Sequence, residues 1–283
     1  MYFCKNSDFE IYTDLACERR CADEKCPEIL FRQEKFSCGK WEKIEVTGEV
    51  GASQLGRPIG FYDTMITDRL DLLDLASIDL IKDALADEIC GMMKKMGASR
   101  ERILIVGLGN ASLTPDSLGA LTADSVKATM HIKKIDEETF RALGCSEIAV
   151  IKPGVGCQSG LDAAKTVSGV CRVIEPSAVI AIDALAARSP ERLGTTVQLA
   201  SCGITPGGGL GNARGAINED SVGAPVISIG IPTVMDAQLF IGEDIRREKS
   251  RSAMFISPKE IDEIVSVGAE IIADGINRAL GIG

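Results

Sequence analysis

The stretch from residue 102 to residue 231 decides the fold because it contains four short apolar runs: RILIV (102–106), EIAVI (147–151), AVIAI (178–182) and PVISIGI (225–231). Each run is rich in β-branched residues and apolar on both faces, a pattern typical of a strand buried within a sheet. Helical stretches, residues 116–132 and 159–174, separate the first three runs. Strands that alternate with helices in this way predict an α/β fold with a mostly parallel sheet.

The flanking regions add helices at both ends and an irregular beginning. Apolar residues recur three or four apart over 71–96, and again from Pro258 to Leu280, so we expect an amphipathic helix in each segment. The first forty or so residues are rich in charge and cysteine, which predicts an irregular N-terminal arm. Residues 41–48 alternate as a strand would, and residues 56–66 fit either a strand or a loop.

Composition excludes several classes of protein. The 283 residues carry 31 Lys and Arg against 41 Asp and Glu, a formal net charge of −10, so a basic nucleic-acid surface is not expected. No apolar run approaches the roughly 18 residues of a membrane span. The opening MYFCKNSDFE has neither the basic nor the apolar region of a signal peptide, and we expect a soluble, non-secreted protein without a membrane partner.

Cysteine and histidine limit the possible metal sites. Five of the ten cysteines crowd the first forty residues, at Cys4, Cys17, Cys21, Cys26 and Cys38. Their spacing is not the paired C-x-x-C pattern, so a zinc site there is an open alternative, and most of the other five are expected to be buried free thiols. The single histidine, His131, excludes zinc hydrolase sites that need two or three imidazoles. We expect His131 to cap or pack near a helix end.

Two aspartates follow predicted strands, where ligands of parallel sheets gather. Asp116 lies in TPDSLG, in which Thr114 and Pro115 read as the start of a helix. Asp116 could simply meet the positive end of that helix. Asp183 follows AVIAI, and it could instead pair with Arg188 or cap the next helix. If the two carboxyl groups meet, they can share one proton and act as base and acid on an amide, which is our hypothesis for the chemistry.

A third unusual segment is GITPGGGLGNARG, residues 203–215. Five glycines within nine residues imply a close approach of the backbone to something else. The segment could cradle phosphate, bind an extended peptide through its main chain, or be a flexible turn. It lacks the Lys-Ser/Thr ending of a P-loop.

Four blocks of this sequence resemble the germination protease family of spore-forming bacteria. They are VGLGNASLTPDSLG (106–119), IKPGV (151–155), VIAIDALAARSPERLGTTVQLASCGITPGGGLGNARG (179–215) and GAPVISIGIPTVMDA (223–237). Because several long motifs occur in the order of the family, the sequence is identified as a member. The resemblance implies an endopeptidase that degrades small acid-soluble spore proteins in the cytoplasm of the forespore and spore core.

The resemblance also implies a mechanism and an assembly. The family is regarded as an atypical aspartic-type peptidase, and its two essential aspartates match Asp116 and Asp183. Its fold is a three-layer α/β/α arrangement that resembles the hydrogenase maturation endopeptidases, and its members are homotetramers that need no cofactor or metal. The expected partners are the protein substrates, without direct contact to nucleic acid. The residues expected to bind substrate lie in the glycine segment: Gly207, Gly208, Gly209, Gly211 and Asn212.

The N-terminus is expected to be a propeptide. IYTDLACE, residues 11–18, is similar to the RTDLAVE processing region of the family, which implies self-cleavage between Asp14 and Leu15. Residues 1–14 would then be the propeptide and 15–283 a single α/β peptidase domain, with 15–66 as its arm and a small extended subregion.

Two alternatives stay open from the sequence alone. Asp116 and Asp183 could be ligands in a metal-dependent processing peptidase of the hydrogenase maturation type. The chain could also be a non-catalytic sporulation protein that binds a partner through the glycine segment.

Overall fold

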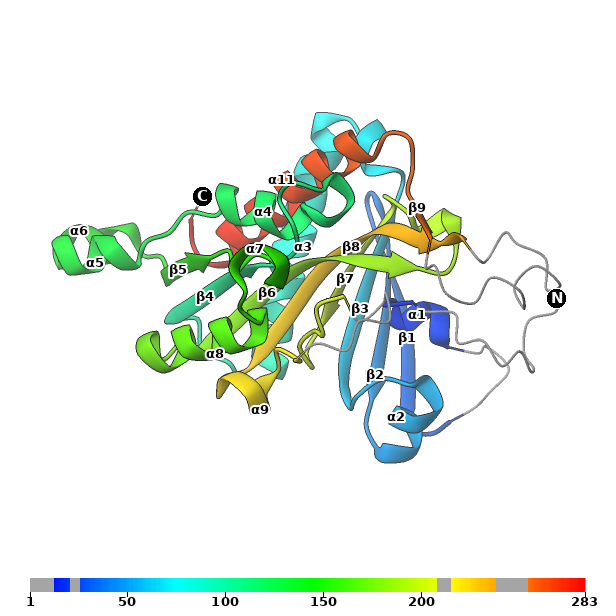
Figure 1. Cartoon of the computed structure of the whole chain (residues 1–283), viewed down its shortest axis with the longest axis horizontal. Helices are drawn as coiled ribbons and strands as arrows, with labels where there is room; N and C mark the ends of the chain where they lie inside the picture. Colours follow the sequence, from blue (N-terminus) through cyan, green and yellow to red (C-terminus); the bar gives the residue numbers. More distant parts are fainter. Residues whose placement is uncertain (1–12, 21–25, 208–214, 238–253, 283) are drawn as a thin grey trace, which may run out of the picture.

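One sheet runs through the whole molecule (Figure 1). The computed structural model describes residues 13–20, 26–207, 215–237 and 254–282, and within them nine strands form the sheet in the order β1-β2-β3-β7-β8-β6-β4-β5, with β9 beside β8. The strands are β1 (Ile29–Phe36), β2 (Gly39–Val46), β3 (Gly60–Thr67), β4 (Arg102–Gly107), β5 (Glu147–Ile151), β6 (Ala178–Ala187), β7 (Thr196–Ala200), β8 (Val226–Asp236) and β9 (Phe255–Ile256).

The four apolar runs form the parallel half of the sheet. β4 pairs in parallel with β5 and with β6, and β6 pairs in parallel with β8. All ten residues of β6 except Ala184 are buried, because helices cover both faces of this half. These four strands confirm the predicted α/β class.

The other half of the sheet is antiparallel, so the sheet is mixed where the sequence predicted a mostly parallel one. β1, β2, β3 and β7 pair in antiparallel order, and β7 joins β8 in the same sense. The predicted irregular arm therefore includes a hairpin, in which only two residues separate Phe36 from Gly39. Its first strand was not predicted because β1 lies at the sheet edge and is mostly exposed, with the charged residues Arg32, Glu34 and Lys35, which hides the strand period.

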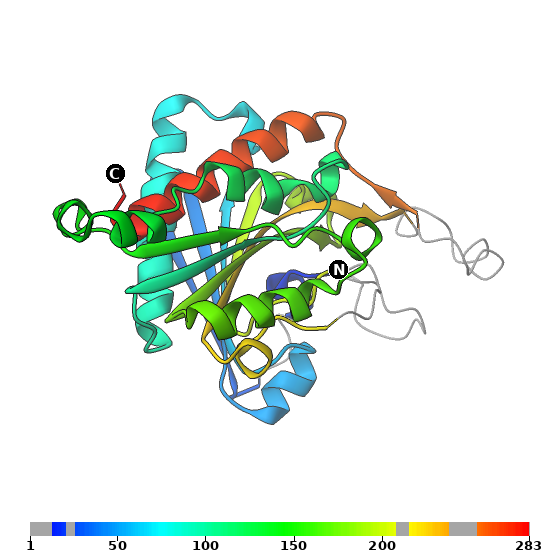
Figure 2. The same cartoon turned by 60° about the vertical axis from the view of Figure 1, so that its left-hand side comes forward.

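Helices cover the sheet on both faces, as Figure 2 shows. On one face α3, α4 and α11 pack over the largest core cluster, and on the other α8 and α9 cover a second cluster around Val179, Ala181 and Val226. The helices, including the short 3₁₀ turns η1 to η3, are α1 (Ala16–Arg19), α2 (Glu49–Leu55), η1 (Leu70–Leu72), α3 (Leu75–Lys95), η2 (Thr114–Asp116), α4 (Leu118–Ser125), α5 (Met130–Ile135), α6 (Glu137–Leu143), α7 (Gly156–Ser159), α8 (Ala163–Ile174), η3 (Pro190–Arg192), α9 (Glu219–Val222) and α11 (Ile261–Ala279).

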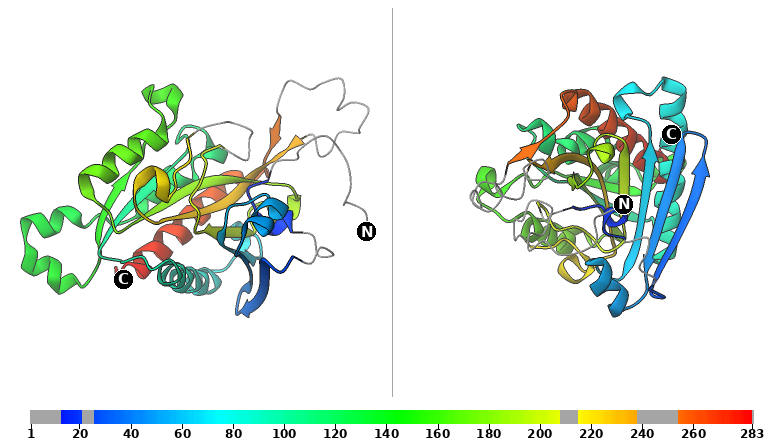
Figure 3. Two further views of the ribbon diagram at one scale, coloured as in Figure 1. Left: turned by 90° about the horizontal axis from the view of Figure 1, so that it is seen from below. Right: turned by 90° about the vertical axis from the view of Figure 1, so that its right-hand side faces the viewer.

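One predicted helix is broken into pieces. The segment 116–132 forms the end of η2, then α4, then the start of α5, because Val126 at the end of α4 takes an extended conformation. α5 and α6 project at one end of the molecule, away from α1 (Figure 3). The other long helices, α3, α8 and α11, lie where the apolar periodicity predicts them. None of the helices in the described ranges is long and apolar enough to cross a bilayer.

Candidate active site

Asp183 lies within β6 at the level where the neighbouring strand stops. β4 ends at Gly107 beside Ile182, whereas β6 continues along β8 to Ala187. The sequence predicted that the strand ends just before Asp183, and the structure corrects this because β8 still pairs with β6 beyond Asp183. The side chain is only 4% exposed, and its Oδ1 accepts a hydrogen bond from the Ala184 N–H at 3.0 Å.

Asp116 ends the 3₁₀ turn that follows β4. Its Oδ2 accepts from the Asn110 N–H at 2.9 Å, and its carbonyl oxygen accepts from the same N–H at 3.0 Å. The turn depends on Gly109, whose φ is +89° and where a Cβ atom would lie 2.0 Å from the Asp116 carbonyl oxygen. From β8, the Thr233 hydroxyl donates to the Pro115 carbonyl at 2.6 Å. The Asp116 carboxyl group is thus held by its own loop, and the hydrogen bond from the Asn110 N–H sets the direction of the side chain.

Glycines bring this loop against β6. The Leu108 N–H donates to the Ile182 carbonyl at 2.8 Å, so the hydrogen bonding between the two segments continues one residue beyond the end of β4. Gly119 in the first turn of α4 packs so closely that a Cβ atom there would lie 2.3 Å from the Ile182 carbonyl oxygen. Only glycine permits this approach, which holds the Asp116 turn beside Asp183.

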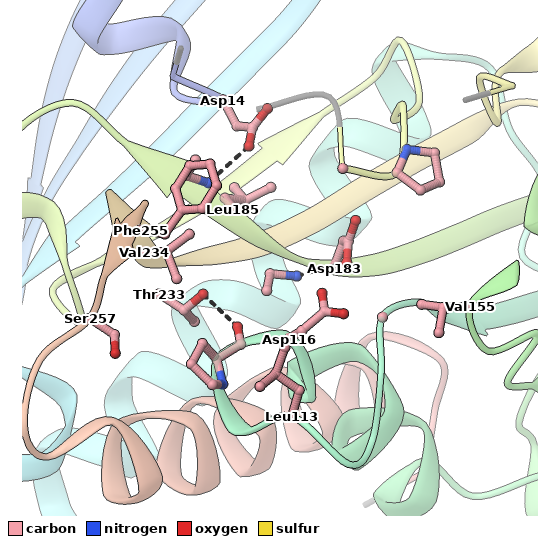
Figure 4. Close-up of a pocket in the computed structure, with 16 residues that line it drawn as sticks. Asp14, Leu113, Asp116, Val155, Asp183, Leu185, Thr233, Val234, Phe255 and Ser257 are labelled. Carbon is pink, nitrogen blue, oxygen red and sulfur yellow. Dashed lines mark hydrogen bonds between the residues drawn. The ribbon is translucent and has the colours of Figure 1, made fainter. Parts of the chain in front are cut away.

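The two aspartates line one pocket of about 360 Å³ (Figure 4). Their carboxyl groups are directed into the same space from opposite walls, Asp183 from the sheet and Asp116 from the η2 turn. The other lining residues come from seven segments of the chain: Asp14, Gly109, Leu113, Pro115, Val155, Ala184, Leu185, Ala186, Pro206, Gly207, Thr233, Val234, Phe255 and Ser257.

A third carboxyl group, that of Asp14, enters this pocket from the N-terminal segment. The Asp14 N–H donates to the Ala186 carbonyl at 2.8 Å, and the Ala186 N–H donates to Asp14 Oδ2 at 2.8 Å. Burial raises the pKa of the Asp14 carboxyl group, although the Ala186 N–H and the guanidinium groups of Arg57 and Arg19 act in the opposite direction. Asp14 thereby joins the pocket through β6, the strand that carries Asp183.

The residues after Asp14 anchor the segment firmly. Leu15 is fully buried in a cluster with Leu185, Ala187, Leu193 and Met235. The Glu18 carboxylate accepts from the backbone N–H groups of Arg188 and Ser189 at 2.7 and 2.8 Å. Of the two residues that flank the predicted processing bond, Asp14 therefore lines the pocket and Leu15 is buried against Leu185, an arrangement that no local sequence pattern could reveal.

The glycine segment is described only in part. Gly207, at φ +67°, lines the pocket together with Pro206. The other residues predicted to bind substrate, Gly208, Gly209, Gly211 and Asn212, lie outside the described residues.

Other residues of the site gave no signal in the sequence. Gln198 on β7 is 7% exposed and binds the main chain of residues 14–16, as detailed below. Thr233, Phe255 and Ser257 line the pocket from β8 and from the segment that carries β9. Nothing in the local pattern distinguished these residues from ordinary core or loop positions.

Neither the single histidine nor any cysteine of the described residues lines the pocket. His131 lies in the first turn of α5 and is exposed. The prediction that it packs or caps at the C-terminal end of a helix was therefore wrong. Among the residues that the structure describes, no three His, Cys, Asp or Glu side chains are grouped so that they could hold a metal ion. Of the N-terminal cysteines, Cys4 and Cys21 fall outside those residues.

Comparison with known proteins gives a consistent family. A family model described as germination protease matches residues 10–246. Curated germination proteases include one from Caldanaerobacter subterraneus subsp. tengcongensis, 32% identical, with 95% of this chain and 94% of that protein covered. Another, from Clostridium acetobutylicum, is 31% identical and covers 95% of each chain. A third, from Bacillus licheniformis, is 35% identical over 84% of this chain and 67% of that protein.

Among solved structures, the [NiFe] hydrogenase maturation protease HycI from Thermococcus kodakarensis aligns with 65% of this chain and 98% of its own. The TM-score is 0.38 and the sequence identity is 17%.

Proposed function

The chain belongs to the germination protease family and is a peptidase, and we propose that it hydrolyses peptide bonds with a water molecule activated by Asp116 and Asp183. The observation that carries this proposal is the pocket into which both carboxyl groups are directed. The proposal is supported by the way the fold brings two distant segments to this pocket: the loop after β4, which carries Asp116, and β6, which carries Asp183.

In this proposal the Asp116 and Asp183 carboxyl groups, which line the same pocket, share one proton. The neutral carboxyl group donates a hydrogen bond to the carbonyl oxygen of the peptide bond, while the ionised one takes a proton from water. The water oxygen then bonds to the carbonyl carbon, the C–N bond breaks, and the nitrogen leaves as an amine after accepting a proton. Main-chain N–H groups of Asn110 and Ala184 orient the two carboxyl groups before substrate arrives.

The same site would process its own N-terminus. Residues 1–14 are the propeptide of this proposal and 15–283 the peptidase domain, with the cut between Asp14 and Leu15. This is supported by Asp14, which lines the pocket, and by Leu15, which is fully buried next to it. With the segment bound there, other polypeptides would be excluded, so the described conformation corresponds to an inactive precursor.

The proposed substrates are small acid-soluble spore proteins, degraded in the spore core during germination. A net charge of −10 fits a protein substrate and offers little attraction to nucleic acid. We also propose that the chain assembles as a homotetramer, as the resemblance implies. The glycine segment would bind the substrate main chain, which is supported by the position of Gly207 on the pocket wall.

The test is cleavage of a purified small acid-soluble spore protein by the processed chain. Asp116→Asn and Asp183→Asn are compared with Asp87→Asn, which changes an exposed aspartate of α3 far from the pocket residues. Losing a general acid or base lowers the rate roughly 100- to 10,000-fold. We expect that loss in the two pocket variants and not in Asp87→Asn.

A chelator separates this mechanism from the metal-dependent alternative. Full activity in the chelator supports the aspartate pair, whereas activity that is lost and then restored by added metal would contradict it. A folded wild-type chain that cuts nothing would favour the non-catalytic alternative.

A further inference from the structure

Gln198 lies in the same row of the sheet as Asp183. Gln198 on β7 pairs with Gly230 on β8, and Gly230 pairs in turn with Asp183 on β6. Gly230 has no side chain to separate them, and a Cβ atom there would lie 2.5 Å from the Asp183 carbonyl oxygen and 2.6 Å from Leu185 Cγ. The Asp183 main chain and the Leu185 side chain therefore fill the place of a side chain at Gly230, and the row carries a buried amide and a buried carboxyl group two strands apart.

The Gln198 carboxamide binds the main chain on both sides of Leu15, through two successive peptide groups. Its Nε2 donates to the Asp14 carbonyl oxygen at 2.9 Å, and its Oε1 accepts from the Ala16 N–H at 2.7 Å. The second bond fixes the orientation of the first, because an amide oxygen held by Ala16 turns the NH₂ group toward Asp14. The carbonyl of Asp14 belongs to the bond that self-processing would cut.

We infer that Gln198 is a catalytic hydrogen-bond donor and main-chain clamp for this peptidase. The inference rests on the proposed function, since it takes the Asp14–Leu15 bond as the one that is hydrolysed. As water adds to the carbonyl carbon, negative charge grows on the oxygen, and the Nε2–H bond to that oxygen strengthens. No proton leaves Gln198. In the processed enzyme the same amide binds the corresponding carbonyl and N–H of a substrate polypeptide.

A carbonyl oxygen has two lone pairs, so it can accept one hydrogen bond from Gln198 and a second from the protonated aspartate of the proposed mechanism. Gln198 is only 7% exposed, which makes its hydrogen bonds stronger than the same bonds in water. Its recognition of main-chain atoms requires no particular side chain, so the clamp suits a polypeptide in extended form.

Binding is tested on the full chain by hydrogen exchange of the Ala16 amide. Gln198→Ala removes both bonds and is expected to speed this exchange at least about tenfold. Gln198→Glu keeps the acceptor for Ala16 and loses the donor at neutral pH, so the amide stays protected. Gln33→Ala, on the exposed strand β1, is the control. Unchanged exchange in Gln198→Ala would overturn the clamp.

Catalysis is tested by the rate of self-processing, followed by intact mass. The removal of one such donor costs roughly 100-fold or more. We expect this loss of rate in Gln198→Glu, although residues 14–16 stay bound in that variant. As the pH falls and the new carboxyl group is protonated, the rate of Gln198→Glu relative to wild type should recover. If Gln198 were only structural, Gln198→Glu would cut at the wild-type rate, and this result would overturn the catalytic role.

Failure of the proposed function gives a different result. A wild-type chain that never cuts the Asp14–Leu15 bond would refute the processing proposal and with it the catalytic role of Gln198. Hydrogen exchange at Ala16 would still decide whether Gln198 binds the segment.

Discussion

Gly119→Ala is expected to separate the two aspartates by pushing the α4 turn away from the sheet. Gly119 is buried at the start of α4, and a new Cβ atom would meet the Ile182 carbonyl oxygen at 2.3 Å and Leu108 main-chain atoms at 2.5 and 2.6 Å. Real Cβ atoms do not approach closer than 3.0 Å, so the turn must move by at least about 0.7 Å, from 3.0 minus 2.3. Asp116 lies three residues before Gly119 and moves with it.

Two opposing effects determine how much Gly119→Ala changes the free energy of unfolding. Overpacking of this kind costs roughly 1–3 kcal/mol, whereas the better helix propensity of alanine returns up to about 1 kcal/mol. The free energy of unfolding should therefore fall by roughly 1–2 kcal/mol. A misplacement near 1 Å can cost about 100-fold in rate, so catalysis should suffer far more than stability.

The assay pairs urea unfolding with the rate of self-processing. Gly169→Ala is the matched control, because that glycine is exposed within α8 and its added Cβ would meet no described atom within 4 Å. The control should gain roughly 0.5–1 kcal/mol and keep its rate. If Gly119→Ala retains the wild-type rate, the close approach of α4 to β6 does not position Asp116, and the reasoning is refuted.

Three further changes have expected outcomes. Burial, and a hydrogen bond with Glu88, raise the pKa of Asp63 to about 7, so the folded protein holds a proton that the unfolded chain releases at lower pH. The free energy of unfolding should then fall from about pH 4 to pH 7, by at most roughly 1.4 kcal/mol per unit, and Asp63→Asn should flatten this dependence in urea titrations. Leu15→Ala should weaken docking of the N-terminal segment by roughly 2–5 kcal/mol, seen as faster exchange of the Ala16 amide; unchanged exchange would contradict this. Asp162→Ala removes the bond to the Lys165 N–H that caps α8 and should cost about 1 kcal/mol in thermal unfolding, whereas Asp162→Asn should cost only a few tenths.

Patterns that depend on burial over a whole element were predictable from the sequence. β6 and β8 are apolar on both faces, and α11 carries a regular apolar stripe, so each gave a clear signal. Asp116 and Asp183 stood out because each follows an apolar run of the sequence, and their meeting in one pocket follows from the parallel pairing of β4 and β6. The exposed edge strand β1 gave no comparable signal.

Contacts between distant segments were not predictable. Gln198 and Asp14 are 184 residues apart, and a single glutamine within a strand resembles any half-buried polar position. The docking of residues 13–18 depends on the burial of Leu15 and on backbone N–H groups of Arg188 and Ser189, which have no sequence signature. Helix breaks such as that at Val126 also reflect tertiary packing more than local propensity.

The measurement that tests the central claim most directly is the intact mass of the purified full chain during incubation, for wild type, Asp116→Asn and Asp183→Asn. If Asp116 and Asp183 activate the water, the wild-type chain loses residues 1–14 and exposes Leu15 as its new N-terminus, while both variants keep their full mass. Release of the same fragment from either variant at the wild-type rate would contradict the account.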